Sequence, residues 1–537
     1  KAFPVNSRDK GGWNNFQGFN DWITFTAWAL AEQVLFVSEA VKEVDPLHPT
    51  SCTPPDVLHN QPVENGRNMW WLADAVDYPS SQMHAHWHLE SADMPKDVLI
   101  AQSASIRKVY CSARGRNANY SGEVLCGPDF GESTRFYSPT AAELMATALC
   151  HLAEGSKGYF FWLWNPLRDG PNAGAWSYRN DDGSPSEKSR LLAHLGAMIQ
   201  KHQELLYKVQ PADSPVAIFD SLDASIYLCR RSQYHAMSEW YAKNAYGFYK
   251  TLRKLQVGCD FVDETAVLNG GVSKYPVIYI PFSMCMTEEI GKALRQYVEQ
   301  GGTLICDSMT AFTPPYHMPF LEQPGAGLKD VLGIKPLQFE LAYSGWMDIV
   351  QTNREKHFDR MQTVEPSEEN KILYTPSGDP TALKAARFIQ PVEPLTAQVL
   401  YRDEAKRPVC TVNRFGKGSA IWTGTLLGLT CWEADTPFES YEEVGSLIRP
   451  YLPKANWTLQ APKNTLICRR LTDEKDSVFV LINEGAGPAD FILDLGQKVV
   501  ARELLWPESA SWKQSSGSTV SGRLDRLSTA VIHCRAE

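Results

Sequence analysis

Apolar residues recur along the first 208 residues with two alternating periods. The stretch DWITFTAWALAEQVLFVSEAVKEVDP (21–46) carries apolar side chains at helical spacing and ends at an Asp-Pro pair. Short apolar runs such as EVLCG (123–127) and KGYFFWLW (157–164) then alternate with further helical patterns. Four strand–helix units follow one another in this way. Because these strands are continuously apolar, the pattern predicts parallel strands covered by helices.

The region from about 209 to 455 repeats the α/β alternation with more compact strands. These are SPVAIFD (214–220), GCDFVD (258–263), YPVIYIP (275–281) and GGTLICD (301–307). Between the last two lies TEEIGKALRQYVEQ (287–300), an amphipathic helix pattern. This order predicts a doubly wound α/β domain.

The last 82 residues show no helical pattern. TLICRRL (465–471), SVFVLINE (477–484) and STAVIHCRA (528–536) predict strands of a small β-sandwich, while SSGSTVSG (515–522) predicts a turn. We therefore predict three domains, at residues 1–208, 209–455 and 456–537.

The composition narrows the range of partners. The chain of 537 residues is 43% hydrophobic and 21% charged, which is typical of soluble globular protein. Its net charge of −10 argues against nucleic acid or an anionic membrane surface as main partner, because either favours a basic face. No apolar run reaches the roughly 18 residues that span a bilayer. The twelve cysteines include no CxxC pair, which favours reduced thiols in a cytoplasmic protein.

Polar and aromatic side chains gather just after each predicted strand of the first domain. In parallel α/β folds, functional groups collect at the carboxyl ends of the strands. Four such ends supply the candidates His84, His86, His88, Asp129, Glu132, Trp162, Trp164, Asn165, Arg168 and Asp169. Indole rings stack on the apolar faces of sugars, and carboxylates and amides bind sugar hydroxyls. These residue types indicate a small carbohydrate as ligand.

The candidate histidines and carboxylates each have two interpretations. His84 and His86 share one face of a predicted strand and could hold zinc, but no third ligand is evident, so hydrogen bonding is the simpler role and no metal is predicted. Asp129 and Glu132 are either catalytic acids or solvated loop and helix-capping carboxylates. Trp162 and Trp164 alternate onto one side of a strand, where they are either core residues or a sugar platform.

The order of these segments resembles a known family. GYFFWLWNPLRDG (158–170), SPVAIFDSLDASIYL (214–228) and YPVIYIPFSMCMTEEIGKALRQYVEQGGTLICD (275–307) closely resemble the family-42 glycoside hydrolases, the thermophile-type β-galactosidases. The resemblance implies a (β/α)8 TIM barrel, an amidotransferase-like domain that drives trimer formation, and a short C-terminal β-sandwich. The expected fold class is thus α/β with the second half of such a barrel, and the expected assembly is a homotrimer.

The resemblance also implies a chemistry. The expected reaction is retaining hydrolysis of terminal β-galactosides or related small glycosides, without a cofactor. Glu132 or Asp129 would be the nucleophile, Trp162 and Trp164 would wall the sugar site, and the remaining hydroxyl contacts would come from His84, His86, Asn165 and Arg168. The family's acid/base lies in an Asn-Glu pair, which residues 1–208 lack. The sequence is therefore expected to begin in mid-barrel and to need a complementing N-terminal half-barrel segment.

Two other functions compete with this interpretation. One is a metal-dependent hydrolase built on His84 and His86. The other is a degenerate glycosidase that binds carbohydrate or serves only in assembly. A half barrel also leaves unpaired sheet edges and an uncovered interior, so the isolated chain is expected to be unstable or to aggregate.

Overall fold

The computed structural model describes residues 16–54, 66–83, 98–116, 119–128, 137–170, 173–231, 236–316, 318–341, 372–373, 383–432, 436–496, 499–507, 513–514 and 518–536. These residues form two compact units. The half-barrel unit contains the described residues of Ala31–Leu58, Met69–Asp213 and Lys454–Glu537. The central unit contains those of Lys1–Leu30, His59–Asn68 and Ser214–Pro453.

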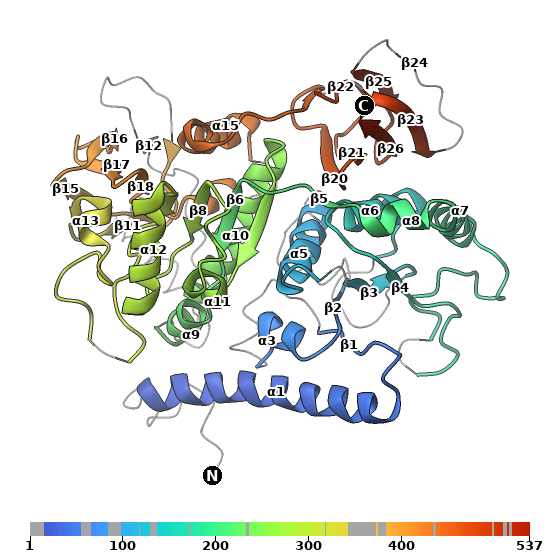
Figure 1. Ribbon diagram of the computed structural model, residues 1–537, viewed down its shortest axis with the longest axis horizontal. Coiled ribbons are helices and arrows are strands. Elements are labelled where there is room, and N and C mark those ends of the chain that lie inside the picture. The colour runs from blue at the N-terminus through green and yellow to red at the C-terminus, as the bar shows by residue number, and fades with distance from the viewer. Residues whose placement is uncertain are drawn as a thin grey trace, which may run out of the picture. The chain divides into compact units, whose positions relative to one another are not determined.

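The half-barrel unit is built on a four-stranded parallel sheet in the order β1-β2-β3-β4 (Figure 1). Its strands are β1 (Ser51–Cys52), β2 (Tyr78–Gln82), β3 (Tyr120–Leu125) and β4 (Tyr159–Trp162). The helices that alternate with them or follow them are α3 (Met69–Asp74), α5 (Val98–Ser112), α6 (Ala141–Ala153), α7 (Glu187–Lys201) and α8 (Gln203–Lys208). The four predicted strand–helix units are confirmed.

Helix α6 shows how local sequence sets these elements. The Thr140 hydroxyl accepts a hydrogen bond from the Glu143 N–H, and the Glu143 carboxylate accepts one from the Thr140 N–H, which forms a complete capping box. Every residue of α6 except Ala142 and Glu143 is buried. Because α6 is buried on nearly all sides, it lies in the interior between the parallel sheet and a second layer.

That second layer is the C-terminal β-structure of the same unit. It has a five-stranded sheet, β23-β26-β21-β20-β5, and a four-stranded sheet, β19-β22-β25-β24. The strands are β5 (Gln210–Pro211), β19 (Thr458–Gln460), β20 (Leu466–Thr472), β21 (Asp476–Asn483), β22 (Ala489–Asp494), β23 (Val499–Trp506), β24 (Lys513–Gln514), β25 (Thr519–Leu524) and β26 (Thr529–Ala536). One apolar core joins residues of α6, α7 and α8 to residues of β20, β21 and β26.

Strand β25 contradicts the turn predicted over residues 515–522. Thr519 to Leu524 pair with β22 along their whole length, and Val520 and Leu524 are buried. The Ser and Gly residues of this segment suggested a turn, but pairing with β22 decided its conformation. Such context dependence is common in strands.

The central unit contains a seven-stranded sheet in the order β16-β17-β18-β9-β8-β6-β7. Strands β18, β9, β8, β6 and β7 run parallel, and β17 and β16 add an antiparallel edge. Their bounds are β6 (Val216–Phe219), β7 (Cys259–Val262), β8 (Val277–Ile280), β9 (Thr303–Cys306), β16 (Gln398–Arg402), β17 (Pro408–Phe415) and β18 (Gly418–Trp422). The doubly wound pattern is confirmed.

Helices cover this sheet, and β6 and β8 lie between α10 and α12 in Figure 1. The helices of the central unit are α9 (Leu222–Arg231), α10 (Ala236–Lys254), α11 (Glu264–Leu268), α12 (Glu288–Gln300), α13 (Lys329–Leu332), α15 (Phe438–Ile448), η2 (Gly428–Cys431) and η3 (Arg449–Tyr451). Helix α1 (Phe16–Val44) is divided between the two units after Leu30. Short paired strands complete the unit: β10 (Ile334–Pro336) with β15 (Val392–Pro394), β11 (Glu340–Leu341) with β14 (Phe388–Ile389), and β12 (Ile372–Leu373) with β13 (Leu383–Lys384).

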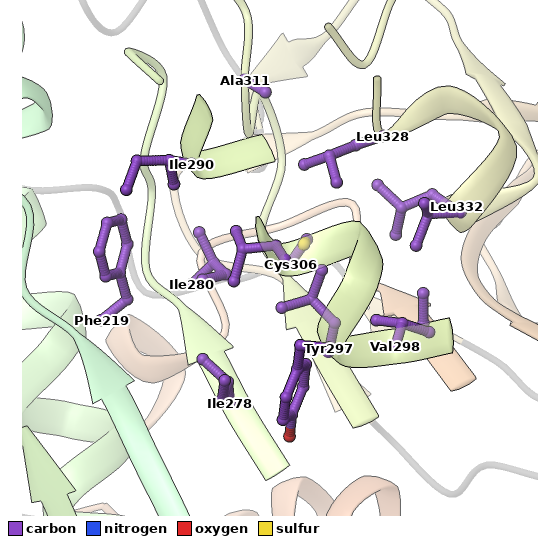
Figure 2. Packing of buried hydrophobic residues seen from close by; sticks show 14 of the residues in the cluster. Phe219, Ile278, Ile280, Ile290, Tyr297, Val298, Cys306, Ala311, Leu328 and Leu332 are labelled. Atoms are coloured by element: carbon purple, nitrogen blue, oxygen red, sulfur yellow. The ribbon is translucent and has the colours of Figure 1, made fainter. Parts of the chain in front are cut away.

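The main core of the central unit forms between α12 and the parallel strands. Figure 2 shows Ile280 and Cys306 on adjacent strands, with Tyr297 and Val298 of α12 beside them. Thr287 caps the helix by accepting a hydrogen bond from the Ile290 N–H. No helix in the described part of the chain is both long and apolar enough to cross a membrane.

Candidate active site

The predicted site residues divide into two groups. Asp129, Glu132, His84 and His86 lie outside the described residues, so their roles stay predictions. Trp162 ends β4, and Trp164, Asn165 and Arg168 follow it in the loop toward α7, all four with exposed side chains. The described part of the predicted site is therefore the carboxyl end of β3 and β4.

Trp162 lies on the face of the sheet that the helices do not cover. Its strand neighbours Tyr159 and Phe161 pack into the helical core, and successive strand residues point to opposite faces. The indole of Trp162 is 38% exposed, and its ring centroid lies 6.3 Å from that of Trp176. An exposed ring at a strand's carboxyl end can bind a sugar face, as predicted for a platform residue.

Trp164 lies beyond the strand and is held by other partners. Its ring is 58% exposed and meets Tyr178 edge to face, with centroids 5.4 Å apart. The Arg179 guanidinium lies 5.0 Å from the ring centroid, and its Nη1 is 3.5 Å from Asn165 Oδ1. These contacts restrain a side chain that would otherwise be free in solvent.

The segment 176–179 pairs with the chain that follows β4. The Leu163 N–H donates to the Trp176 carbonyl at 2.9 Å, and the Tyr178 N–H donates to the Leu163 carbonyl at 3.2 Å. The Ser177 hydroxyl donates to the Trp164 carbonyl at 3.0 Å. The backbone around both tryptophans predicted to line the sugar site is thus hydrogen-bonded to the segment 176–178.

The same segment contacts the end of β3. The Trp176 N–H donates to the Pro128 carbonyl at 2.7 Å. A Cβ on Gly127 would lie 2.2 Å from the Ser177 carbonyl oxygen, so only glycine permits this approach. Gly127 and Pro128 therefore leave β3 along a path that residues 176 and 177 fix, one residue before Asp129.

Burial shapes the electrostatics on the helix side of these strands. It raises the pKa of the Cys126 thiol and the Tyr178 hydroxyl, and it lowers the pKa of the Lys188 ammonium. Lys188 Nζ donates to the Ser138 hydroxyl at 3.1 Å.

Sequence reasoning missed Trp176, Tyr178 and Arg179. They lie 12 to 15 residues beyond Trp164 in a stretch without helical or strand periodicity. The aromatic-basic string WSYR was a signal, but no local pattern indicated that it returns to the strand ends. Only the pairing between residues 163–164 and 176–178 reveals it.

A bound metal ion requires several converging ligands. Among the described residues, no three His, Cys, Asp or Glu side chains converge in a way that would hold a metal ion. The zinc alternative rests on His84 and His86, which lie outside that part of the chain.

The central unit has a second set of strand ends, where β6 is flanked by β7 and β8. Open α/β sheets often bind ligands at such a reversal of strand order. Here the Asp307 carboxylate after β9 is fully buried and accepts hydrogen bonds from Asn244 Nδ2 at 2.5 Å, the Tyr279 hydroxyl at 2.6 Å and the Thr423 hydroxyl at 3.1 Å. Burial raises the pKa of Asp307 to about 6. These hydrogen bonds assign Asp307 a structural role, because its carboxylate links residues of α10, β8 and the segment after β18.

The thiols near these strand ends are poor nucleophiles. Burial raises the pKa of Cys285 and of Cys306, so both remain protonated at neutral pH. A cysteine nucleophile needs a lowered pKa. The amidotransferase-like architecture of this unit is thus not accompanied by an amidotransferase-like thiolate at Cys285 or Cys306.

Comparison with known families identifies the central unit. Residues 215–434 match the family model of the β-galactosidase trimerisation domain. The β-galactosidase BgaA of Clostridium cellulovorans is 24% identical over 228 residues, which cover 41% of this chain and 29% of that protein. The β-galactosidase LacZ of Heyndrickxia coagulans is 21% identical over 336 residues, which cover 61% and 44% respectively. The chain thus spans less than half the length of these curated relatives.

Solved structures show the same fold over nearly the whole chain. Gan42B, a GH42 β-galactosidase from G. stearothermophilus, matches with a TM-score of 0.77 at 14% identity, over 100% of this chain and 70% of that one. A β-galactosidase from Bacillus circulans sp. alkalophilus matches with a TM-score of 0.75 at 14% identity, over 96% and 68%. An exo-carrageenase GH42 from Bacteroides ovatus matches with a TM-score of 0.54 at 11% identity, over 97% and 57%.

Proposed function

We propose that the chain belongs to glycoside hydrolase family 42 and is the larger part of a β-galactosidase-like enzyme that hydrolyses terminal β-galactosides or related small glycosides. The observation that carries the proposal is the pair of supported, exposed indoles, Trp162 and Trp164, at the carboxyl ends of the barrel strands. Their rings provide the apolar surface that a galactose ring face needs.

The proposed reaction is a retaining double displacement. Glu132 or Asp129 attacks the anomeric carbon and forms a glycosyl-enzyme intermediate, which water then hydrolyses. Both residues follow Gly127-Pro128, whose path the Trp176 N–H restrains. Such restraint matters because the nucleophile must lie about 5 to 5.5 Å from the acid/base carboxyl.

The acid/base is assigned to no residue of this chain. Residues 1–208 contain no Asn-Glu pair, and four parallel strands form half of an eight-stranded barrel. We propose that a complementing segment of four strand–helix units supplies it and closes the barrel. His84, His86, Asn165 and Arg168 are proposed to bind sugar hydroxyls.

Assembly and location complete the proposal. The trimerisation-domain match supports a homotrimer formed through the central unit. None of the eleven cysteines whose side chains the structure describes forms a disulfide, which is in keeping with a reducing compartment such as the cytoplasm.

The test is hydrolysis of an aryl β-galactoside by the full-length gene product and by Glu132→Gln and Asp129→Asn. The variant that removes the nucleophile is expected to lower kcat by at least about 10³-fold, because the covalent step then lacks its attacking group. Asp181→Asn, at an exposed carboxylate in the loop before α7, is the matched control and should stay within about twofold of wild type.

Two results would contradict the proposal. If wild-type protein leaves the aryl galactoside intact, the glycosidase activity is refuted. If neither variant is impaired, the nucleophile is not in the segment after β3. A wild-type enzyme that also cleaves other aryl glycosides would broaden the substrate class, since proteins of this fold include an exo-carrageenase.

A further inference from the structure

One buried side chain at the carboxyl ends of β3 and β4 carries an unsatisfied donor. Trp176 is 7% exposed, and its indole Nε1–H has no acceptor within the described chain. A buried N–H without an acceptor is costly, and nearly all buried polar groups have a partner. The absence of one at this place therefore needs a physical reason.

The backbone does not let Trp176 turn away to find an acceptor. Its N–H donates to the Pro128 carbonyl, and its carbonyl accepts from the Leu163 N–H, so it is fixed to the ends of both strands. Its φ of 65° lies in the left-handed region, which is uncommon for a side chain of this size. Non-glycine residues in this region cluster at functional sites.

A second unsatisfied indole shows what distinguishes Trp176. Trp422 is 1% exposed and its Nε1–H also lacks an acceptor among the described residues. Trp422 lies in β18 within the apolar core of the central unit. Trp176 packs against Leu125 and Ala175, but unlike Trp422 it also lies beside the exposed ring of Trp162, at the strand ends where barrel enzymes bind substrate.

We propose that Trp176 is a further residue of the sugar site, whose indole N–H donates to an oxygen acceptor that completes the site. The inference rests on the proposed glycosidase function. Two oxygens have the right chemistry: a hydroxyl of the bound glycoside, and the nucleophile carboxylate, which follows Pro128 by one or four residues. With a hydroxyl, Trp176 selects the substrate; with the carboxylate, it is a positioning residue that keeps the nucleophile ionised.

The experiment compares Trp176→Phe with Trp422→Phe in the full-length gene product. Both substitutions remove a buried indole N–H and keep an aromatic ring. For Trp176→Phe we expect kcat/KM for an aryl β-galactoside to fall about 3- to 10-fold or more, the value of one lost hydrogen bond. Trp422→Phe should remain within about twofold of wild type. Thermal midpoints confirm that both variants are folded under the assay conditions.

Two further readouts identify the acceptor and exclude a purely structural role. If it is a hydroxyl, the loss disappears with the one deoxy-galactoside that lacks this hydroxyl. If it is the carboxylate, the acidic limb of the kcat/KM profile moves to higher pH, because the ionised form has lost a donor. A loss that is equal for all deoxy substrates, with an unmoved acidic limb, would overturn the inference.

The outcome also separates this inference from the proposed function. Equal activity of wild type and Trp176→Phe refutes the role of Trp176 and leaves the glycosidase intact. If wild type is inactive, calorimetric titration with galactose decides: weaker binding in Trp176→Phe alone supports the sugar contact, and any other result refutes it. Should Trp176→Phe fail to fold, Trp176→Tyr keeps a ring and a donor and is tested with the same two readouts.

Discussion

At the scale of single residues, burial decides which carboxyl groups ionise. Glu264, at the start of α11, accepts a hydrogen bond from the Leu222 N–H at 2.7 Å. Burial, and after it the charge of Asp223, raise the pKa of Glu264 to about 8. Nothing in the local sequence DETAV distinguishes this glutamate from an exposed one. Its protonation state follows from its burial beside Asp223 and the start of α9.

The sign of the resulting pH dependence follows from the two states. In the unfolded chain Glu264 has an ordinary pKa near 4.5, and in the folded protein the pKa is about 8. The folded state therefore binds an extra proton between these values, and the free energy of unfolding falls as pH rises from about 4.5 to about 8. Glu264→Gln keeps the acceptor for Leu222 and removes the charge, so it should flatten this decline.

The measurement is urea unfolding of wild type and Glu264→Gln at several pH values across that window. The difference between the two proteins should grow with pH. Glu289→Gln, at an exposed position in the first turn of α12, is the control and should track wild type. A constant difference between wild type and Glu264→Gln at all pH values would show that Glu264 is ionised throughout.

At the scale of elements, glycine is required by packing in one helix and only destabilises another. Gly291 lies inside α12, where an added Cβ would be 2.0 Å from the Ala326 carbonyl oxygen. Gly196 lies inside α7, where an added Cβ would meet nothing within 4 Å. Helical propensity disfavours both glycines, but a tertiary contact requires only the first.

Substitution by alanine should separate these contributions. Gly196→Ala is expected to raise the free energy of unfolding by about 0.5–1 kcal/mol, through helix propensity alone. Gly291→Ala is expected to lower it by about 1–3 kcal/mol, because Ala326 and its backbone must shift. Denaturant unfolding measures both, each variant serving as the other's control. A stabilising Gly291→Ala would show that the close approach of α12 to Ala326 is not required.

At the scale of the whole molecule, the open face of the half-barrel sheet is the dominant feature. Tyr78, Tyr120 and Phe160 form a row of contacting rings across β2, β3 and β4, with centroids 5.0 and 5.3 Å apart. Phe160 is 59% exposed, on the face opposite the helical core. Strands β1 and β4 end the sheet without a further partner strand in the described chain. Such a surface favours association.

The chain of residues 1–537 expressed alone is therefore expected to form assemblies larger than the proposed trimer. Phe160→Thr should shift the mass distribution toward the trimer, because it removes an apolar ring from the open face. Light scattering after size exclusion measures the masses. Ile492→Thr, at a 44% exposed position on β22, is the control and should leave the distribution unchanged. A monodisperse wild-type trimer would contradict the open-face prediction.

The sequence by itself determined the elements and their order. Continuous apolar runs located the compact strands β6, β7, β8 and β9, because burial on both faces demands such runs. The alternation of helical patterns with short strand-like runs located the four parallel strands of the half barrel. Trp162 and Trp164 were identified as site candidates because strand ends are read directly from such runs. The strand β25 was missed because Ser and Gly residues in it have no local preference for pairing.

Only the tertiary structure decided which residues meet. Contacts between positions far apart in the chain bring segment 176–179 back to the strand ends and place Ser177 against Gly127. They also bury the indole of Trp176 without an acceptor in the described chain. The pKa of Asp307 and of Glu264 likewise depends on burial by other elements. Periodicity records which face of an element is buried, whereas hydrogen bonds and close packing between elements leave no period in the sequence.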